Sequence, residues 1–99
     1  MGKYERLFFC DKSIVLNAIY DALDAIGFTI DSANSGRGVL IVSGMSPPLS
    51  GRIAISSLLA GDRTSVEVFP QENDQNQTEW ISALFDETES VIRKAGMMK

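Results

Sequence analysis

The sequence contains no histidine, a single cysteine and few basic residues. Without histidine, the chain lacks the commonest general base, the usual partner in a catalytic triad and a frequent metal ligand. One cysteine, Cys10, excludes an intrachain disulfide, and the count excludes zinc sites built from cysteine and histidine. We therefore expect a protein that is not an enzyme and that holds no cofactor or metal.

Long apolar runs are also missing, so no segment is suited to span a membrane, and we expect no membrane partner. The N-terminal residues lack the apolar region of a signal peptide. A lone cysteine is typical of a reducing compartment. Together these features predict a cytoplasmic location.

Positive charge is scarce, with nine basic against thirteen acidic residues and a net charge of −4. Nucleic-acid affinity comes largely from lysine and arginine that neutralise phosphates, so we expect no nucleic-acid partner. The length of 99 residues is that of one domain, so we expect a single domain over 1–99. A chain of this length hides only about 65% of the surface that its unfolded form exposes.

The clearest pattern in the chain is an amphipathic helix over 11–26 followed by a hairpin over 28–42. Apolar residues recur at helical spacing on one face of that segment: Val15, Ile19, Ala22, Leu23 and Ile26. Asp11 or Ser13 is placed to cap the N-terminus, and Gly27 to end the helix in a left-handed conformation. The segment 34–37 has turn chemistry, and the run 39–42 returns as an apolar strand.

Three further strands and a second helix complete the prediction. Alternating or apolar patterns predict strands over 3–10, 52–59 and 64–69, and a helix that runs to about Ala95. The two prolines within 43–51 predict a loop there. The order is therefore β-α-β-β-β-β-α. Two helices cannot hide both faces of a five-stranded sheet, so we expect an α+β fold with a curved, mainly antiparallel sheet and both helices on one face.

This order of elements resembles the TATA-box-binding-protein-like fold group, whose smaller members share the helix-grip topology. The resemblance covers nearly the whole chain and implies the fold. The DNA-binding members of that group have paired phenylalanine wedges and a basic sheet face, and this acidic chain has neither at a matching position. No functional residue of the group is therefore carried over, since a fold does not fix a function.

The strand over 39–42 carries apolar residues on both of its faces. If both helices lie on one side of the sheet, either Val39 and Ile41 or Leu40 and Val42 must point away from them. We take Leu40 and Val42 as the outward pair, and expect a second copy of the chain or another protein to cover them. Two simpler explanations stay open: a misread register, and the few exposed apolar groups that central strands often carry.

Two other features are candidates for the same contact. The segment 45–49 places restricted prolines between apolar residues and is suited to present a preorganised surface: Met45, Pro47, Pro48 and Leu49. It serves equally well as a simple connection between strands. Trp80 opens the last helix, either as an exposed anchor for a partner or packed over the sheet edge.

We therefore predict a small binding domain that self-associates, as a homodimer, or docks a protein through its sheet. Two other functions stay open. A carrier of a small apolar ligand needs a pocket of about 300 Å³ or more between the sheet and the C-terminal helix. An enzyme needs charged residues gathered in one concave pocket, for which the candidates are Asp31, Arg52, Arg63 and Glu67.

Overall fold

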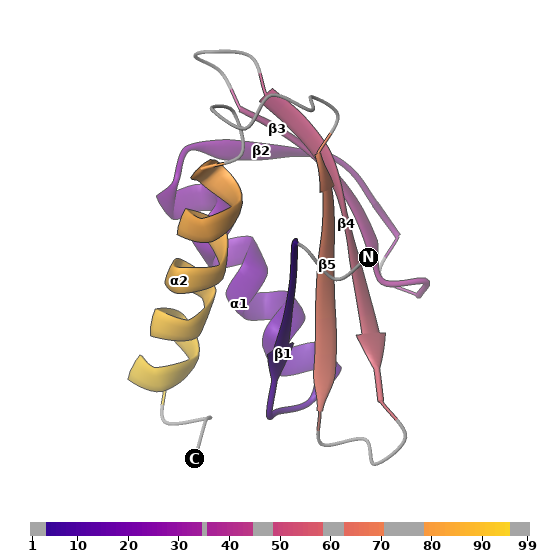
Figure 1. The fold of residues 1–99 in the computed structure, drawn as a ribbon, viewed down its shortest axis with the longest axis vertical. Coiled ribbons are helices and arrows are strands. Elements are labelled where there is room, and N and C mark those ends of the chain that lie inside the picture. The colour runs from indigo at the N-terminus through magenta and orange to yellow at the C-terminus, as the bar shows by residue number, and fades with distance from the viewer. Residues whose placement is uncertain (1–3, 35, 45–48, 59–62, 71–78, 96–99) are drawn as a thin grey trace.

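The structure, a computed structural model, describes residues 4–34, 36–44, 49–58, 63–70 and 79–95. These residues form five strands and two helices in the predicted order (Figure 1). The elements are β1 (Glu5–Phe8), α1 (Lys12–Ala25), β2 (Phe28–Asn34), β3 (Val39–Gly44), β4 (Leu49–Ser57), β5 (Thr64–Pro70) and α2 (Glu79–Lys94). The predicted α+β class is confirmed.

The strands form one open antiparallel sheet in the order β1-β5-β4-β3-β2, so β4 is the central strand. The sheet twists strongly, and β2 crosses the top of the molecule at a steep angle to β5 (Figure 1). The register between β2 and β3 shifts between Ile30 and Ser32, which marks a β-bulge at Asp31. The bulge reverses the side-chain alternation along β2, the strand at the sheet's edge.

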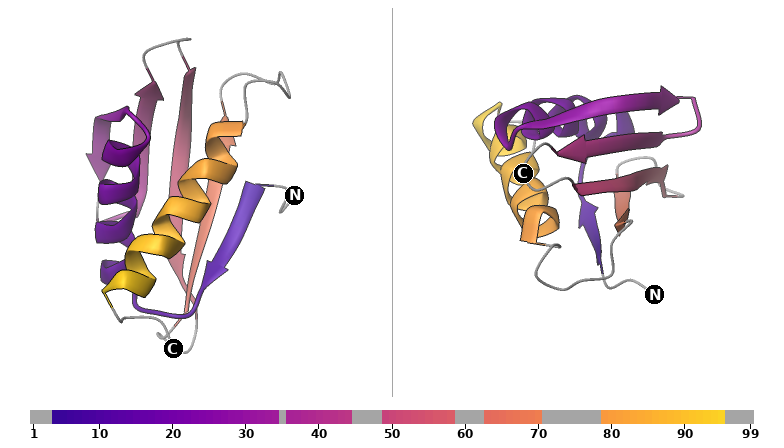
Figure 2. Two further views of the ribbon diagram at one scale, coloured as in Figure 1. Left: turned by 90° about the vertical axis from the view of Figure 1, so that its left-hand side faces the viewer. Right: turned by 90° about the horizontal axis from the view of Figure 1, so that it is seen from above.

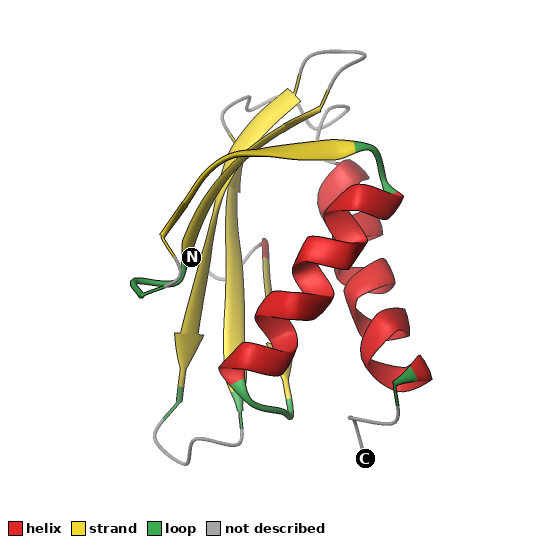
Figure 3. Ribbon diagram, turned by 180° about the vertical axis from the view of Figure 1, so that it is seen from behind, coloured by secondary structure: helices red, strands yellow, loops and turns green. Residues whose placement is uncertain are grey.

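Both helices lie side by side against the same face of the sheet (Figures 2 and 3). They pack on each other and on the inward residues of the strands, and these side chains form one buried core cluster. Every second residue of the strands is apolar and faces the helices, and the helices turn their own apolar faces toward the sheet. The two sets of side chains therefore pack into one core. The expected arrangement of two helices on one face is confirmed.

The N-terminal half of the core depends on where α1 ends. Gly27 has a φ of +83°, the left-handed conformation predicted for a glycine that stops a helix. The Ile26 and Gly27 amides donate to the carbonyl oxygens of Ala22 and Asp24. At the other end, Asp11 is the N-cap residue but its side chain makes no capping hydrogen bond, contrary to the prediction.

Several strand boundaries differ from the prediction. Of the described residues in the predicted range 3–10, β1 occupies Glu5–Phe8, and Phe9 and Cys10 lie beyond its end. β4 begins at Leu49, within the segment predicted as a loop, because Ser50 and Gly51 take their places in the ladder opposite Ser43 and Val42. Prolines restrict their own backbone and the residue before them, so they do not prevent a strand from starting directly afterwards.

Aromatic rings close the core at the end where β2 and α2 begin. The rings of Phe28 and Trp80 stack with centroids 4.8 Å apart. Glycines make the room for them: a Cβ at Gly44 would lie 2.9 Å from the Phe28 ring, and one at Gly51 would lie 3.1 Å from the Trp80 ring. The first turn of α2 is thereby tied to the edge strand β2.

Candidate functional site

The candidate site is the face of the sheet that points away from the helices. We call it the outer face and define it by the residues that alternate with the buried ones along β1, β5, β4 and β3. The register places these residues in neighbouring positions: Glu5, Leu7, Val39, Ile41, Ser43, Ser50, Arg52, Ala54, Ser56, Ser65, Glu67 and Phe69.

The choice of Leu40 and Val42 as the outward pair is wrong. Both are completely buried against the helices, with an exposed fraction of 0%. Val39 and Ile41 form the outward pair, and Ile41 is 38% exposed. Because side chains alternate with period two, an error of one residue in the assumed orientation exchanges the two pairs. The conclusion that one apolar pair of this strand faces outward still holds.

Large apolar side chains lie exposed across the outer face. Ile41 lies on β3, Phe69 on β5 and Leu7 on β1, and their exposed fractions are 38–40%. Phe9 and Leu58 extend the same alternation just beyond the ends of β1 and β4, and Phe9 is 58% exposed. An antiparallel sheet with one face in water normally carries polar residues on that face. The outer face therefore carries large exposed apolar side chains among its polar residues, which a solvated sheet does not require.

Arginine guanidinium groups cover the two exposed phenylalanine rings. The Arg52 guanidinium carbon lies 4.6 Å from the centroid of the Phe69 ring, and that of Arg63 lies 5.5 Å from the Phe9 ring. These are cation–π contacts. Within the described part of the chain, neither arginine forms an ion pair. Arg52 lies in register with Phe69, so its guanidinium contacts that ring and not a carboxylate of its own sheet.

Two carboxylates lie opposite each other on the same face. Glu5 of β1 and Glu67 of β5 are direct cross-strand partners. Such partners have Cβ atoms about 5 Å apart, and two like charges at that spacing are destabilising. The Ser65 hydroxyl donates to Glu5 Oε2 at 2.7 Å, which stabilises one of the two carboxylates. Along the strands, a positive residue (Arg52) is therefore followed by two negative residues (Glu5 and Glu67) and then by a positive residue at the rim (Arg63).

The other predicted contact residues lie elsewhere. Met45, Pro47 and Pro48, and the side chain of Leu49, fall outside the described residues. Trp80 is only 7% exposed and stacks on Phe28, so it packs at the edge of the sheet and is not an exposed anchor. A tryptophan at the start of a helix is consistent with an exposed anchor and with packing over the sheet. The space left by the missing side chain of Gly51 is what allows the Trp80 ring to pack on the sheet.

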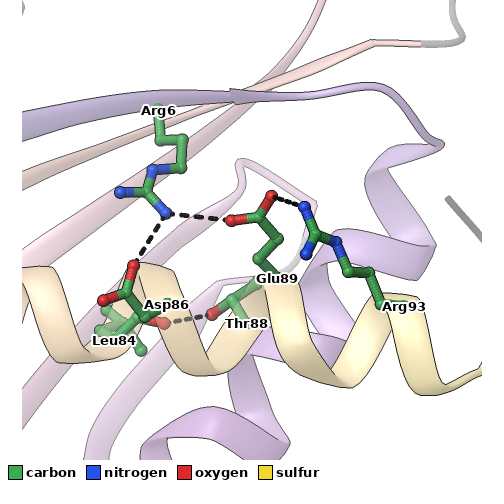
Figure 4. Close-up of polar contacts among 6 residues, drawn as sticks. All are labelled: Arg6, Leu84, Asp86, Thr88, Glu89 and Arg93. Carbon is green, nitrogen blue, oxygen red and sulfur yellow. Dashed lines mark hydrogen bonds and ion pairs between the residues drawn. The ribbon is translucent and has the colours of Figure 1, made fainter.

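An open hollow lies between β1 and the start of α2. Its volume is about 400 Å³, and it is lined by Tyr4, Glu5, Arg6, Glu79, Ile81, Ser82 and Phe85. Arg6 forms one wall, with its guanidinium 5.1 Å from the Phe85 ring centroid and Nη1 at 3.3 Å from Asp86 Oδ1 (Figure 4). The hollow has charged groups at its rim, whereas the space directly beneath α2 is filled by buried side chains.

Burial raises the pKa of the Cys10 thiol, and the Asp11 carboxylate raises it further, so the thiol is not activated as a nucleophile. Among the described residues, no group of three or more Cys, Asp or Glu could hold a metal ion. None of the predicted charged set (Asp31, Arg52, Arg63 and Glu67) lines the hollow beside β1 or a smaller one between the helices.

In the described part of the chain, neither helix has the length and apolar character needed to cross a bilayer. The sequence matches no protein-family model and no curated protein.

Proposed function

We propose that this protein is a small non-enzymatic interaction domain that acts as a homodimer, with the outer faces of two copies packed together. The single observation that carries the proposal is the set of large apolar side chains exposed on that face. Several large apolar side chains exposed on one face of a domain favour a contact site there. Twofold pairing would cover the same residues on both copies at once.

The distribution of charge favours the sheet over the helices as the contact. The two helices carry six acidic and three basic residues. Their solvent side repels a second copy. On the outer face and its rim, the two positive charges of Arg52 and Arg63 equal the two negative charges of Glu5 and Glu67. Two acidic chains therefore meet with least repulsion through their sheets.

The test compares two isoleucines of equal exposure. Ile41 and Ile30 are both 38% exposed, but Ile41 is on the outer face, whereas Ile30 lies in register with the buried Val42. We expect the wild-type chain to elute as a dimer in size-exclusion chromatography with light scattering. Ile41→Asp should shift it to a monomer, because the new carboxylate would be desolvated in the contact. Ile30→Asp should leave it dimeric.

A monomeric wild-type chain at every concentration tested would refute the homodimer. So would equal effects of the two substitutions. The proposed compartment is the cytoplasm, since Cys10 is a buried free thiol and a reducing environment preserves free thiols.

The hollow beside β1 supports a second candidate, a site for a small ligand with an apolar part. Its volume exceeds what such a ligand needs, and Ile81 and Phe85 provide apolar lining. The hollow is open to solvent and has charged groups at its rim, so it would bury little of an apolar ligand. We therefore place this function after the homodimer. We expect the wild-type chain to enhance the fluorescence of anilinonaphthalene sulfonate by binding the dye in this hollow. Ser82→Trp would fill the hollow and should abolish that enhancement. Ile41→Asp lies on the outer face and should leave it unchanged.

A further inference from the structure

We infer that Arg52 of each copy pairs with Glu67 of the other across the dimer, and that these two ion pairs set the register of the interface. This inference rests on the proposed function, since it names the contact that aligns the two outer faces.

Arg52 lies at the centre of the outer face. It belongs to β4, the middle strand, where its direct cross-strand neighbours are Ile41 on β3 and Phe69 on β5. Its guanidinium rests on the Phe69 ring, a contact that favours this orientation of the side chain. A charge held in place loses little conformational freedom on binding. Arg52 is thus a preorganised cation between two apolar side chains, Ile41 and Phe69, that a partner would cover.

Glu67 lies in the adjacent row of residues. It is opposite Ala54 on β4, two residues along from Arg52, and opposite Glu5 on β1. The carboxylate of Glu67 therefore faces a like charge within its own chain. A cation from outside would relieve that repulsion, and the Arg52 row and the Glu67 row are only about 7 Å apart along the strands.

Twofold symmetry brings these two groups together. Consider an axis that lies in the interface and crosses the strands between the Arg52 row and the Glu67 row. It places each row opposite the other row of the second copy, with Glu67 of that copy one strand, about 5 Å, to the side of Arg52. One register therefore produces two equivalent Arg52–Glu67 contacts. The same operation packs Ile41 near Val39 of the second copy. Packed sheets stand about 10 Å apart, a separation that these long side chains can bridge.

Arg63 provides a matched comparison. It too is an arginine stacked on an exposed phenylalanine, Phe9, and is without an ion pair among the described residues. However, it precedes β5 and lies at the rim of the sheet, and this twofold axis does not bring it opposite a carboxylate. Rim charges contribute little to affinity.

The experiment is a charge swap followed by sedimentation equilibrium. Arg52→Glu and Glu67→Arg should each raise the dimer dissociation constant at least about tenfold, because each places like charges in both contacts. The double variant, Arg52→Glu with Glu67→Arg, should restore it to within about threefold of wild type. Arg63→Glu should change it less than about threefold. Emission from the only tryptophan, Trp80, reports whether each variant is folded.

The outcomes separate the two proposals. A dimeric wild type whose affinity is indifferent to Arg52→Glu, or is not restored by the swap, overturns the Arg52–Glu67 register and leaves the homodimer standing. Equal losses from Arg52→Glu and Arg63→Glu also overturn it, since a general charge effect would then suffice. A monomeric wild type overturns both proposals.

Discussion

Gly38 shows how one missing side chain permits a close approach of two backbones. It follows the turn between β2 and β3 with a φ of +72°, and its carbonyl oxygen accepts from the Ile55 amide at 2.7 Å. A Cβ at this position would collide with the Ile55 carbonyl oxygen and approach the Lys12 side chain to 3.0 Å. Gly38 therefore lets the hairpin dock directly against β4.

Replacing Gly38 by alanine should lower the free energy of unfolding by about 2–4 kcal/mol, because the left-handed backbone and the collision add together. Gly36→Ala is the control within the same turn. A Cβ there would meet only Asn34 Oδ1, at an ordinary 3.6 Å, so the loss should stay below about 1 kcal/mol. Urea unfolding followed by Trp80 emission measures both. Similar losses in the two variants would contradict this account.

At the scale of elements, β1 is the least secured strand. It has four residues and pairs with β5 alone. Its side-chain link to α2 is Arg6, whose Nη1 donates to Asp86 Oδ1 at 3.3 Å and to Glu89 Oε1 at 3.4 Å (Figure 4). Glu89 is shared with Arg93, which donates to it at 2.9 Å. Residues 80 or more positions apart in the chain are thereby joined.

Arg6→Met keeps the apolar stem of the side chain and removes its charge. We expect the free energy of unfolding to fall by about 1 kcal/mol at low salt, and by less at high salt, where the ion pairs are screened. Arg93→Met is the matched control: Arg93 is 69% exposed and pairs within one helix, so the loss should be about 0.5 kcal/mol or less. Urea unfolding at two ionic strengths tests this, and a loss for Arg6→Met that is independent of salt would contradict it.

The elements of this fold were predictable from the sequence, and their orientation was not. The span of α1 and its end at Gly27 depend on residues close together in the chain, so local sequence patterns were enough to predict both. Which side of β3 faces the helices depends on the whole sheet, because Leu40 and Ile41 are equally apolar. The same holds for Arg52, whose contact with Phe69 depends on the register between β4 and β5.

At the scale of the whole molecule, charge and apolarity are separated between two surfaces. The helix layer is acidic on its solvent side, and the sheet presents apolar side chains with balanced charges. Between these layers lies one continuous core that reaches from Phe8 and Cys10 at one end to Trp80 at the other. A core of this kind is expected to open cooperatively, as a unit.

Cys10 can test that expectation. Its side chain is 6% exposed, and burial raises the pKa of its thiol above the ordinary value of 9.0, so few native molecules carry a reactive thiolate at pH 8. Ellman's reagent at that pH should therefore modify the native chain at least about a hundredfold more slowly than the chain in urea. Absorbance at the wavelength of the released thiolate follows the reaction. Rapid modification without denaturant would show that this end of the core opens separately.

The β-bulge at Asp31 has a consequence for assembly. A regular border strand offers its unpaired amides and carbonyls to any neighbouring chain, and repeated addition there produces fibres. The extra residue in β2 interrupts that row and leaves a carboxylate beside it, so strand-by-strand growth is disfavoured on this side. Association through the outer face then stops at a dimer, because the twofold pairing leaves no second outer face free.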